Sequence, residues 1–454
     1  MAMSDRDELT APAARPRQRR GWWIVLTGTL IFAAALGAYI LMAVLYPASF
    51  WKMNDLVIYR LGGIVARQDG PLYTATFLKS ALRFTYPPAS AMLFAALSNL
   101  SLAVLKVVMT VASLLALLFS AWLAWGAAGV RTPVARAGAA LAVAGLTLWT
   151  DPVQASLGFG QINLVIMIIA LADLCQRDSR WWKGAGVGIA AGLKLTPAIF
   201  ILYLLVTRRF RAAIIAIAAF GATIAAGFIM LPTQSHKYWL GGLFFDSNRT
   251  GGNDYVANQS LYGVIVRMMH SPGGARPYWI ATAIVIGICG LALAAWAHRR
   301  GQELTAIVTC AVTGLLISPV SWDHHWVWID PLLVAVLAPA WRYRSKVAWA
   351  GAFVLLALFF QYPIPPPQGG AVFPIGLIWT VPNKGNLEYT WTGLQVVTGN
   401  LYASCGLVIL GTVAITLAVT RKRSRGAGEL ESGGLEPAPV PEPLGTEVSP
   451  DPAR

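Results

Sequence analysis

One aspartate near the start of the chain has the surroundings of a general base. Asp55 follows the first long apolar segment, within Asn54-Asp-Leu-Val-Ile-Tyr-Arg60, and precedes a short amphipathic stretch. Partial burial at a membrane surface would raise the pKa of its carboxyl group toward the value that suits a base. Tyr59 and Arg60 are close enough in sequence to orient it. An aspartate that only caps the following helix would give the same pattern, so both interpretations stay open.

The densest group of polar and aromatic residues is Ser318-Pro-Val-Ser-Trp-Asp-His-His-Trp-Val-Trp328. Two adjacent histidines on a helix point about 100° apart, so His324 and His325 would not easily bind one metal ion, and we expect no metal. Either histidine could instead donate a hydrogen bond to a phosphate, while Trp322 stacks on a sugar ring. Interfacial anchoring explains the tryptophans but not the histidine pair.

Two pairs of amide side chains stand beside apolar runs. Gln161 and Asn163 supply both donors and acceptors, which suits sugar hydroxyl groups, but they could also cap a helix. Asn258 and Gln259 are similar in kind. With Ser260 they also match the three-residue pattern of a glycosylation acceptor.

Prolines mark two further candidate positions. In Phe84-Thr-Tyr-Pro-Pro88 the double proline fixes an extended entry to an apolar run, which would hold Arg83 and Tyr86 at the interface or serve as structural punctuation alone. Lys194 precedes Thr196-Pro197 in the middle of the apolar stretch 184–206. A lysine and a proline at that depth predict a broken helix that lines a cavity. Lys194 would then neutralise a lipid phosphate, or it would extend to the interface.

The elements that must position these residues are membrane spans. Of the 454 residues 56% are hydrophobic and only 12% are charged, which is half the charge density of an ordinary soluble domain. About 10 to 12 apolar runs approach the roughly 20 residues that a bilayer requires. The sequence therefore predicts an all-α, polytopic membrane protein. The runs cover 22–46, 89–105, 107–126, 134–149, 161–175, 184–206, 210–231, 278–297, 304–321, 324–340, 347–361 and 401–420.

Basic clusters between the later runs mark the cytosolic side, because positive loops stay inside. The long polar stretches 232–277 and 362–400 then lie on the extracytoplasmic face, together with Asp55. We expect a basic cytosolic tail over 1–20, a membrane domain over 21–423 and a disordered cytosolic tail over 424–454. This arrangement predicts a multi-pass protein of the cell (plasma) membrane.

Composition also argues against several classes. Lys and Arg outnumber Asp and Glu by 35 to 20, but they occur in short clusters between apolar runs, which fits contact with membrane lipids and not with nucleic acid. No GxGxxG or GxxxxGK[ST] pattern is present, which disfavours nucleotide-driven transport. The four cysteines lack CxxC spacing, so we expect free thiols and no structural metal.

Six of these stretches, in this order, resemble the family 87 glycosyltransferases, integral-membrane enzymes typified by actinobacterial polyprenyl-phosphomannose-dependent α-1,2-mannosyltransferases. The resemblance covers roughly residues 20–420. It is carried by Asn54–Tyr59, Phe84–Pro88, Gly160–Asn163, Lys194–Pro197, Asn258–Leu261 and Ser318–Trp326.

This resemblance implies a membrane glycosyltransferase fold of the GT-C type and a lipid-linked sugar donor, with no cofactor. It implies that Asp55 is the catalytic base. The implied reaction moves mannose from a polyprenyl-phosphate-mannose donor to a glycolipid acceptor of the cell envelope, a phosphatidylinositol mannoside or lipomannan. The product would be an α-1,2 linkage.

Two rival functions fit many of the same features. An arabinofuranosyltransferase would use a decaprenyl-phosphate donor on the same scaffold. A transporter or flippase of lipid-linked sugars would also need many spans and a polar cavity. Long outer loops, the lack of detectable inverted repeats and the gathering of candidate residues at one face argue against transport.

Overall fold

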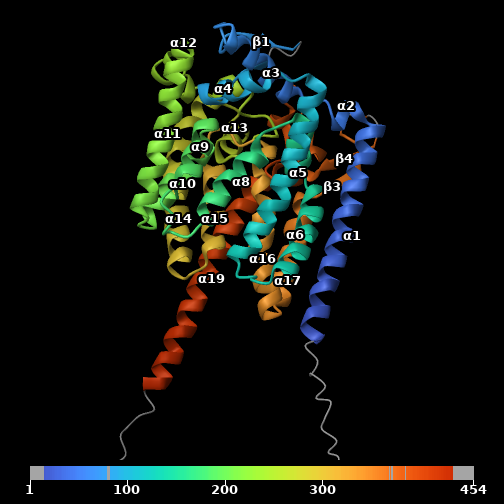
Figure 1. Ribbon diagram of the computed structural model, residues 1–454, viewed down its shortest axis with the longest axis vertical. Coiled ribbons are helices and arrows are strands. Elements are labelled where there is room, and N and C mark those ends of the chain that lie inside the picture. The colour runs from blue at the N-terminus through green and yellow to red at the C-terminus, as the bar shows by residue number, and fades with distance from the viewer. Residues whose placement is uncertain (1–14, 79–81, 368, 370–371, 384, 433–454) are drawn as a thin grey trace, which may run out of the picture.

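The computed structural model describes residues 15–78, 82–367, 369, 372–383 and 385–432. These residues form an elongated helical bundle, and short helices, loops and two small hairpins gather toward one end of it (Figure 1). Residues 1–14 and 433–454, which make up most of the two predicted tails, lie outside the described residues. The predicted mostly helical membrane protein is confirmed, whereas its GT-C type stays a prediction.

Among the described residues, five helices are long and apolar enough to cross a membrane. Their apolar stretches of 19 residues or more exceed or match the thickness of a bilayer. They are α1 (Arg15–Leu45), α5 (Leu102–Ala127), α11 (Phe210–Met230), α14 (Pro272–Arg299) and α19 (Leu401–Ser432). Helix α1 packs along α6, α14 along α15 and α11 along α9.

Shorter apolar helices fill the rest of the bundle, so the prediction of about 10 to 12 crossings stays a prediction. They are α4 (Pro88–Leu97), α6 (Pro133–Leu148), α9 (Ala185–Leu193), α10 (Ile199–Val206), α15 (Glu303–Ile317), α16 (Ile329–Tyr343) and α17 (Lys346–Phe359).

The stretch 184–206 is a broken helix, as predicted. Helix α9 ends at Leu193, Lys194 is extended, with φ −151° and ψ 130°, and the 3-10 helix η1 (Thr196–Ala198) leads into α10. Pro197 lacks the N–H that a continuous helix would need. The Lys194 N–H still donates to the Ala190 carbonyl over 2.9 Å, and the helix ends there, at the depth where the apolar run predicted a cavity.

A second break, which the apolar pattern did not reveal, separates α7 (Asp151–Phe159) from α8 (Asn163–Leu174) by a bend of 118°. Gly160 makes the turn in the left-handed region, with φ +68°, and a Cβ atom there would lie 2.7 Å from Cβ of Leu56. Only glycine combines that backbone conformation with so close an approach. The bend brings Gln161 and Asn163 to the start of α8.

The run 89–105, expected as one span, is divided into α4 and α5. Ser101 caps α5, because its side chain accepts a hydrogen bond from the Val104 N–H. A polar Ser98-Asn-Leu-Ser101 segment supplies such caps and turns, which interrupts the helix. Helix α3 (Asn54–Arg67) packs on α4 at the end of the bundle opposite the start of α1 and the end of α19 (Figure 1).

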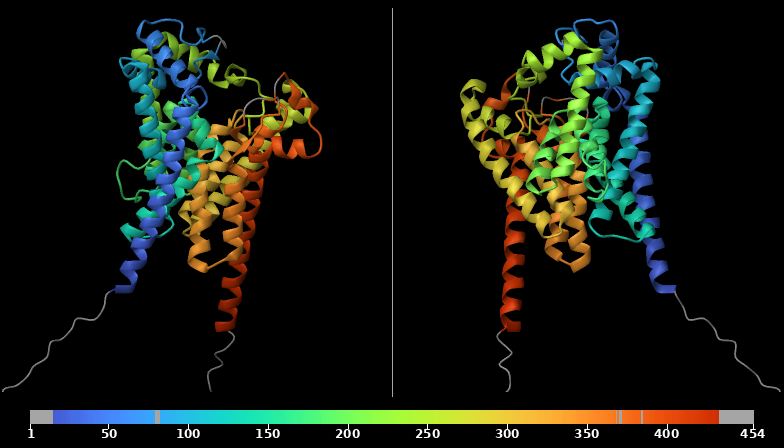
Figure 2. Two further views of the ribbon diagram at one scale, coloured as in Figure 1. Left: turned by 90° about the vertical axis from the view of Figure 1, so that its right-hand side faces the viewer. Right: turned by 60° about the vertical axis from the view of Figure 1, so that its left-hand side comes forward.

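The two long polar stretches lie toward the same end as α3, above the long helices (Figure 2). The first holds α12 (Pro232–Ser235), the π-helix η2 (His236–Leu240), the 3-10 helices η3 (Leu243–Phe245) and η4 (Ser247–Thr250), and α13 (Leu261–Met269). The second holds the 3-10 helices η6 (Leu377–Thr380) and η7 (Leu387–Thr390) and helix α18 (Leu394–Gly399).

Sheet is limited to two hairpins in the described residues. Strand β1 (Thr76–Phe77) pairs with β2 (Leu82–Arg83), and β3 (Gln361–Ile364) pairs antiparallel with β4 (Phe373–Gly376) in the register Gln361 to Gly376. The remaining short elements are α2 (Pro47–Phe50) and the 3-10 helix η5 (Asp323–Trp328), which joins α15 to α16.

Candidate active site

Asp55 lies in the first turn of α3 and does not cap it. Met53 takes the N-cap position in the left-handed region, and no side chain caps this helix. The Met53 N–H donates to the Gly158 carbonyl over 2.9 Å, which ties the start of α3 to α7. Oδ2 of Asp55 accepts a hydrogen bond of 2.5 Å from Nε2 of Gln161. The carboxylate therefore faces the bend between α7 and α8.

A chain of hydrogen bonds continues from Gln161 into the protein. The Tyr86 hydroxyl donates to Oε1 of Gln161 over 2.8 Å and accepts from the Tyr59 hydroxyl over 2.9 Å. With its oxygen held by Tyr86, the amide of Gln161 must present its N–H to Asp55. Tyr86 lies just before Pro87 and Pro88, where the fixed φ angles begin α4.

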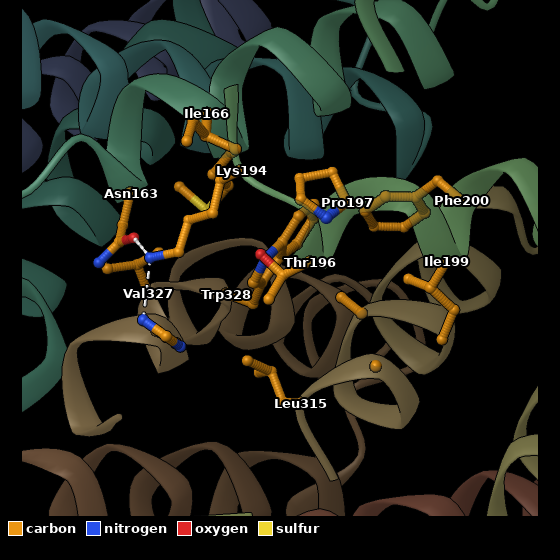
Figure 3. Close-up of a pocket in the computed structure, with 14 residues that line it drawn as sticks. Asn163, Ile166, Lys194, Thr196, Pro197, Ile199, Phe200, Leu315, Val327 and Trp328 are labelled. Atoms are coloured by element: carbon orange, nitrogen blue, oxygen red, sulfur yellow. Dashed lines mark hydrogen bonds between the residues drawn. The ribbon is translucent and has the colours of Figure 1, made fainter. Parts of the chain in front are cut away.

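Lys194 closes this chain from the other side. Its Nζ donates to Oδ1 of Asn163 over 2.7 Å and to the Tyr86 hydroxyl over 3.2 Å, and lies 2.9 Å from Nε2 of His325 (Figure 3). An ammonium group only donates, so Nε2 of His325 accepts and this histidine is neutral. Lys194 is 7% exposed, and within the described residues no carboxylate lies within ion-pair distance of it. A buried cation without a paired anion is suited to an anionic ligand.

Side chains from α7 and α8 fix the backbone of η5. Nδ2 of Asn163 donates to the His324 carbonyl over 2.8 Å, and the Ser156 hydroxyl donates to the same oxygen over 3.0 Å. The rings of His324 and His325 are inclined at 85°, with centroids 4.8 Å apart, so they address different directions. Across the described residues no group of three or more His, Cys, Asp or Glu side chains could hold a metal ion.

Burial changes the acidity of the two carboxyl groups that face this region from helices outside the candidate spans. It raises the pKa of Asp55, while His324, the Gln161 hydrogen bond and Lys194 act in the opposite direction. Burial also raises the pKa of Asp323, to about 7. Asp55 is thus moved toward the range in which a carboxylate works as a base near neutral pH.

Two cavities adjoin these residues. The first, here called the lysine cavity, has an empty volume of about 460 Å³ and lies between the α9–α10 break and α15 (Figure 3). Its polar lining is Lys194, Asn163, Thr196 and His325, and its walls are otherwise apolar. The apolar lining comprises Ile166, Met167, Pro197, Ile199, Phe200, Ala311, Gly314, Leu315, Val327 and Trp328.

The second cavity, here called the carboxylate cavity, has an empty volume of about 870 Å³ and includes Asn54, the residue before Asp55. Its polar lining differs from that of the lysine cavity, because it contains Asp151, Gln154, Asp323 and Gln361. Helix η5 contributes Asp323 to this cavity and His325 to the other. The remaining lining residues are Ala48, Ser49, Phe50, Lys52, Ala155, Gly158, Phe159, Phe373, Pro374, Ile375 and Trp379.

The structure brings together eight of the predicted site residues in one hydrogen-bonded group, and three of them, Asn163, Lys194 and His325, line the lysine cavity. The eight are Asp55, Tyr59, Tyr86, Gln161, Asn163, Lys194, His324 and His325. Trp322 is half-buried beside them, with its ring 6.4 Å from that of Tyr255.

Two predicted arginines lie apart from this group. Nε of Arg60 donates to the Leu100 carbonyl over 3.1 Å, so Arg60 joins α3 to the turn before α5. Arg83 is exposed on β2.

Asn258 and Gln259 are buried, and their side chains bind backbone groups. Oδ1 of Asn258 accepts from the Ser321 N–H over 3.0 Å, and Nε2 of Gln259 donates to the Gly399 carbonyl over 2.8 Å. Together with the bond of 2.8 Å from the Asp323 N–H to the Ala257 carbonyl, these contacts hold the segment that enters η5. In the fold Asn258 is fully buried, which leaves no access for a glycosylating enzyme.

Sequence analysis missed most of the carboxylate cavity. Asp151 accepts hydrogen bonds from Gln361, Trp379 and Tyr402. The scarcity of acidic residues within the apolar body was a signal for Asp151, because a buried acid there requires partners. Gln361 and Trp379 carried no local signal.

Comparison with known proteins gives one family and several relatives. The model of glycosyltransferase family 87 matches residues 84–319. A Mycobacterium tuberculosis protein named polyprenol-phosphate-mannose-dependent alpha-(1-2)-phosphatidylinositol mannoside mannosyltransferase is 30% identical over 85% of this chain and 89% of its own length. Its counterpart of the same name from Mycolicibacterium smegmatis is 32% identical over 68% of this chain and 75% of its own.

A further Mycobacterium tuberculosis protein, named for the corresponding transfer to phosphatidylinositol pentamannoside, is 28% identical over 92% of both chains. No solved structure matches the chain. The family match begins at residue 84, so Asp55 lies outside the matched range.

Proposed function

We propose, from the premise that this chain belongs to glycosyltransferase family 87 and is a glycosyltransferase, that the sugar it transfers is mannose carried by polyprenyl phosphate. The proposed acceptor is a phosphatidylinositol mannoside or a lipoglycan built on one, and the proposed linkage is α-1,2. The donor is a co-substrate, and the reaction needs no further cofactor. We place the reaction at the plasma membrane, on its extracytoplasmic face.

The lysine cavity has the chemistry of a site for a lipid phosphate. Lys194 supplies an unpaired ammonium group beside the neutral His325, and apolar side chains line the rest of the space. The phosphate oxygens of the donor would take the place opposite Nζ, with the isoprenoid chain along the apolar wall. A fixed positive charge at this point stabilises the phosphate as it leaves, because little water screens it.

The proposed step is direct displacement at the anomeric carbon. The acceptor oxygen forms a bond to that carbon while its proton passes to Asp55, and the bond from the carbon to the phosphate oxygen breaks. The phosphate leaves with the electron pair, next to Lys194. A β-linked mannosyl phosphate would then give an α-linked product. Gln161 holds Oδ2 of Asp55, which leaves the other carboxylate oxygen for the acceptor.

The observation that supports this assignment most is the continuous hydrogen-bonded path from Asp55 through Gln161 and Tyr86 to Lys194. Four segments that are distant in sequence supply these four side chains. The base lies at one end of this network and the cation at the other. A displacement reaction requires this arrangement, because the base activates the attacking hydroxyl group while the cation stabilises the leaving phosphate.

The test is transfer of labelled mannose from synthetic polyprenyl phosphomannose to phosphatidylinositol mannoside by purified protein. Asp55→Asn should lower kcat by about 10²- to 10⁴-fold, because the amide cannot accept the proton. Asp69→Asn, in the exposed turn that follows α3, is the matched control and should keep full activity.

A folded Asp55→Asn protein with wild-type activity would exclude Asp55 as the base. If wild type used decaprenyl-phosphate arabinose but not the mannose donor, the sugar assignment would be wrong. Movement of labelled lipid across vesicles without a new glycosidic bond would support a flippase instead.

A further inference from the structure

The carboxylate cavity is lined by residues with hydrogen-bond acceptors that no other described residue satisfies. Oε1 of Gln154, Oε1 of Gln361 and Oδ2 of Asp323 are buried side-chain oxygens without a partner. All three residues line this one cavity. An unsatisfied buried oxygen costs about 1–3 kcal/mol, so three in one place indicate a ligand that supplies donors.

The orientation of the two amides follows from their other contacts. Nε2 of Gln154 donates to the Leu148 carbonyl over 2.8 Å, and Nε2 of Gln361 donates to Oδ1 of Asp151 over 3.3 Å. Rotating either amide would set its oxygen against another oxygen. Both amides therefore keep their acceptor atom for the ligand. Oδ1 of Asp323 lies 3.2 Å from Nδ1 of His324, which leaves Oδ2 as its free acceptor.

Asp151 organises the wall that carries these groups. Its carboxylate accepts from Trp379 Nε1 over 3.1 Å and from the Tyr402 hydroxyl over 3.0 Å, in addition to Gln361. These donors come from η6, α19 and β3, three elements that the single carboxylate joins. The indole of Trp379 is thus fixed at the cavity, where Phe159 and Phe373 add further aromatic surface. Aromatic side chains offer apolar faces for the C–H groups of a ring.

The carboxylate cavity lies next to the start of α3, the helix that carries Asp55. Asn54 and Gly158 both line the cavity, and Gly158 accepts the hydrogen bond that fixes Met53 at the start of α3. Asn54 precedes Asp55 in the chain, so the cavity adjoins the turn of α3 that carries the base. The two buried acids of the lining, Asp151 and Asp323, disfavour a phosphate group, and the one lysine of the lining, Lys52, is exposed; the lysine cavity has a buried ammonium group instead.

We propose that the carboxylate cavity binds the sugar ring of the acceptor that receives the mannose, with Gln154, Gln361 and Asp323 accepting hydrogen bonds from its hydroxyl groups. This inference rests on the proposed function, because it assumes that Asp55 activates a hydroxyl group. The ligand class is a hydroxyl-rich ring without charge near the wall. The attached lipid or glycan extends from the cavity.

The test separates the two substrates kinetically. Gln154→Leu and Gln361→Leu should each raise the KM for phosphatidylinositol mannoside by about tenfold, the effect of one lost hydrogen bond, while the KM for polyprenyl phosphomannose stays unchanged. Gln234→Leu is the matched control: Gln234 is buried and also has an unpartnered Oε1, but it lines neither cavity. Its two KM values should equal those of wild type.

A second variant tests the space without removing any hydrogen bond. Ala155 lines the cavity, and Ala155→Phe should fill it, raise the acceptor KM by tenfold or more and again leave the donor KM unchanged. Methyl α-mannoside should inhibit wild type by competing with the acceptor, and it should no longer inhibit Ala155→Phe.

The outcomes distinguish this inference from the proposed function. A wild-type protein that is inactive with the mannose donor contradicts the proposed function. An active wild type, with folded Gln154→Leu and Ala155→Phe proteins that keep the wild-type acceptor KM, overturns the inference alone. A rise in the donor KM in these variants would assign the cavity to the donor sugar and overturn it as well.

Discussion

The lysine cavity and the carboxylate cavity lie on two sides of the same short helix, yet their chemistry is opposite. One offers an unpaired ammonium group within apolar walls, and the other offers carboxylate and amide oxygens between aromatic rings. In a 3-10 helix successive residues point about 120° apart, so η5 can direct Asp323 to one cavity and His325 to the other. In the proposed reaction, one turn of backbone separates the phosphate that leaves the sugar carbon from the hydroxyl group that attacks it.

The largest change in kinetics is expected from Lys194→Met, which removes the positive charge of the lysine cavity. The change keeps the length of the side chain but removes the ammonium group, so kcat should fall by about 10²- to 10³-fold and the donor KM should rise. The acceptor KM should stay as in wild type, as measured by mannose transfer with each substrate varied in turn. The control is Lys237→Met, because Lys237 is exposed and lines neither cavity. An equal rise in both KM values would mean that the cavities do not separate the substrates.

A smaller effect should follow from Gln161→Leu, which breaks the hydrogen-bonded path from Asp55 to Lys194. The Gln161 hydrogen bond lowers the pKa of Asp55 against the raising effect of burial, so its loss leaves that pKa higher. The base works deprotonated, and activity disappears as pH falls through its pKa. The acidic limb of kcat/KM should therefore move to higher pH, and activity at neutral pH should fall by about tenfold. If the folded variant keeps the acidic limb of wild type, Gln161 does not influence the pKa of the base.

Gln259→Leu should affect stability more than chemistry. Gln259 binds the Gly399 carbonyl and the Tyr402 N–H, and the substitution leaves both groups buried without partners. The expected loss is about 1–3 kcal/mol of unfolding free energy. Thermal unfolding in detergent measures it, and both KM values of the folded fraction should remain near wild type. A selective rise in one KM would instead show that Gln259 contacts a substrate.

The smallest effect is expected from Arg83→Ala. Arg83 is exposed on the β1–β2 hairpin and lines neither cavity. Transfer activity and both KM values should stay within about twofold of wild type, in line with a surface substitution. A clear rise in the acceptor KM would extend the acceptor site beyond the carboxylate cavity to this hairpin.

The sequence predicted the residues of the lysine cavity better than those of the carboxylate cavity, for a physical reason. Lys194 and Pro197 interrupt an apolar run, which is costly in a membrane, and this local conflict predicted both the break and the cavity. Gln361 and Trp379 reach the other cavity only because β3 pairs with β4 and Asp151 binds both side chains. Such contacts between distant segments leave no periodicity to detect.

The same limit applies to the roles of amide side chains. Gln161 and Asn258 looked alike in the sequence, since each adjoins an apolar run. The left-handed turn at Gly160 directs Gln161 to Asp55, whereas Asn258 lies against the backbone of Ser321. Whether an amide meets a ligand or a peptide group depends on tertiary packing, which residue type alone does not encode.

The placement of the two terminal helices constrains how often the chain traverses the bilayer. Helix α1 begins, and α19 ends, at the same end of the bundle, opposite α3 (Figure 2). A chain that enters and leaves on one side must cross an even number of times. The five long helices therefore cannot be the complete set, and at least one shorter or bent helix must complete a crossing. An even number of spans, such as 10 or 12, fits this placement, and the number itself stays a prediction.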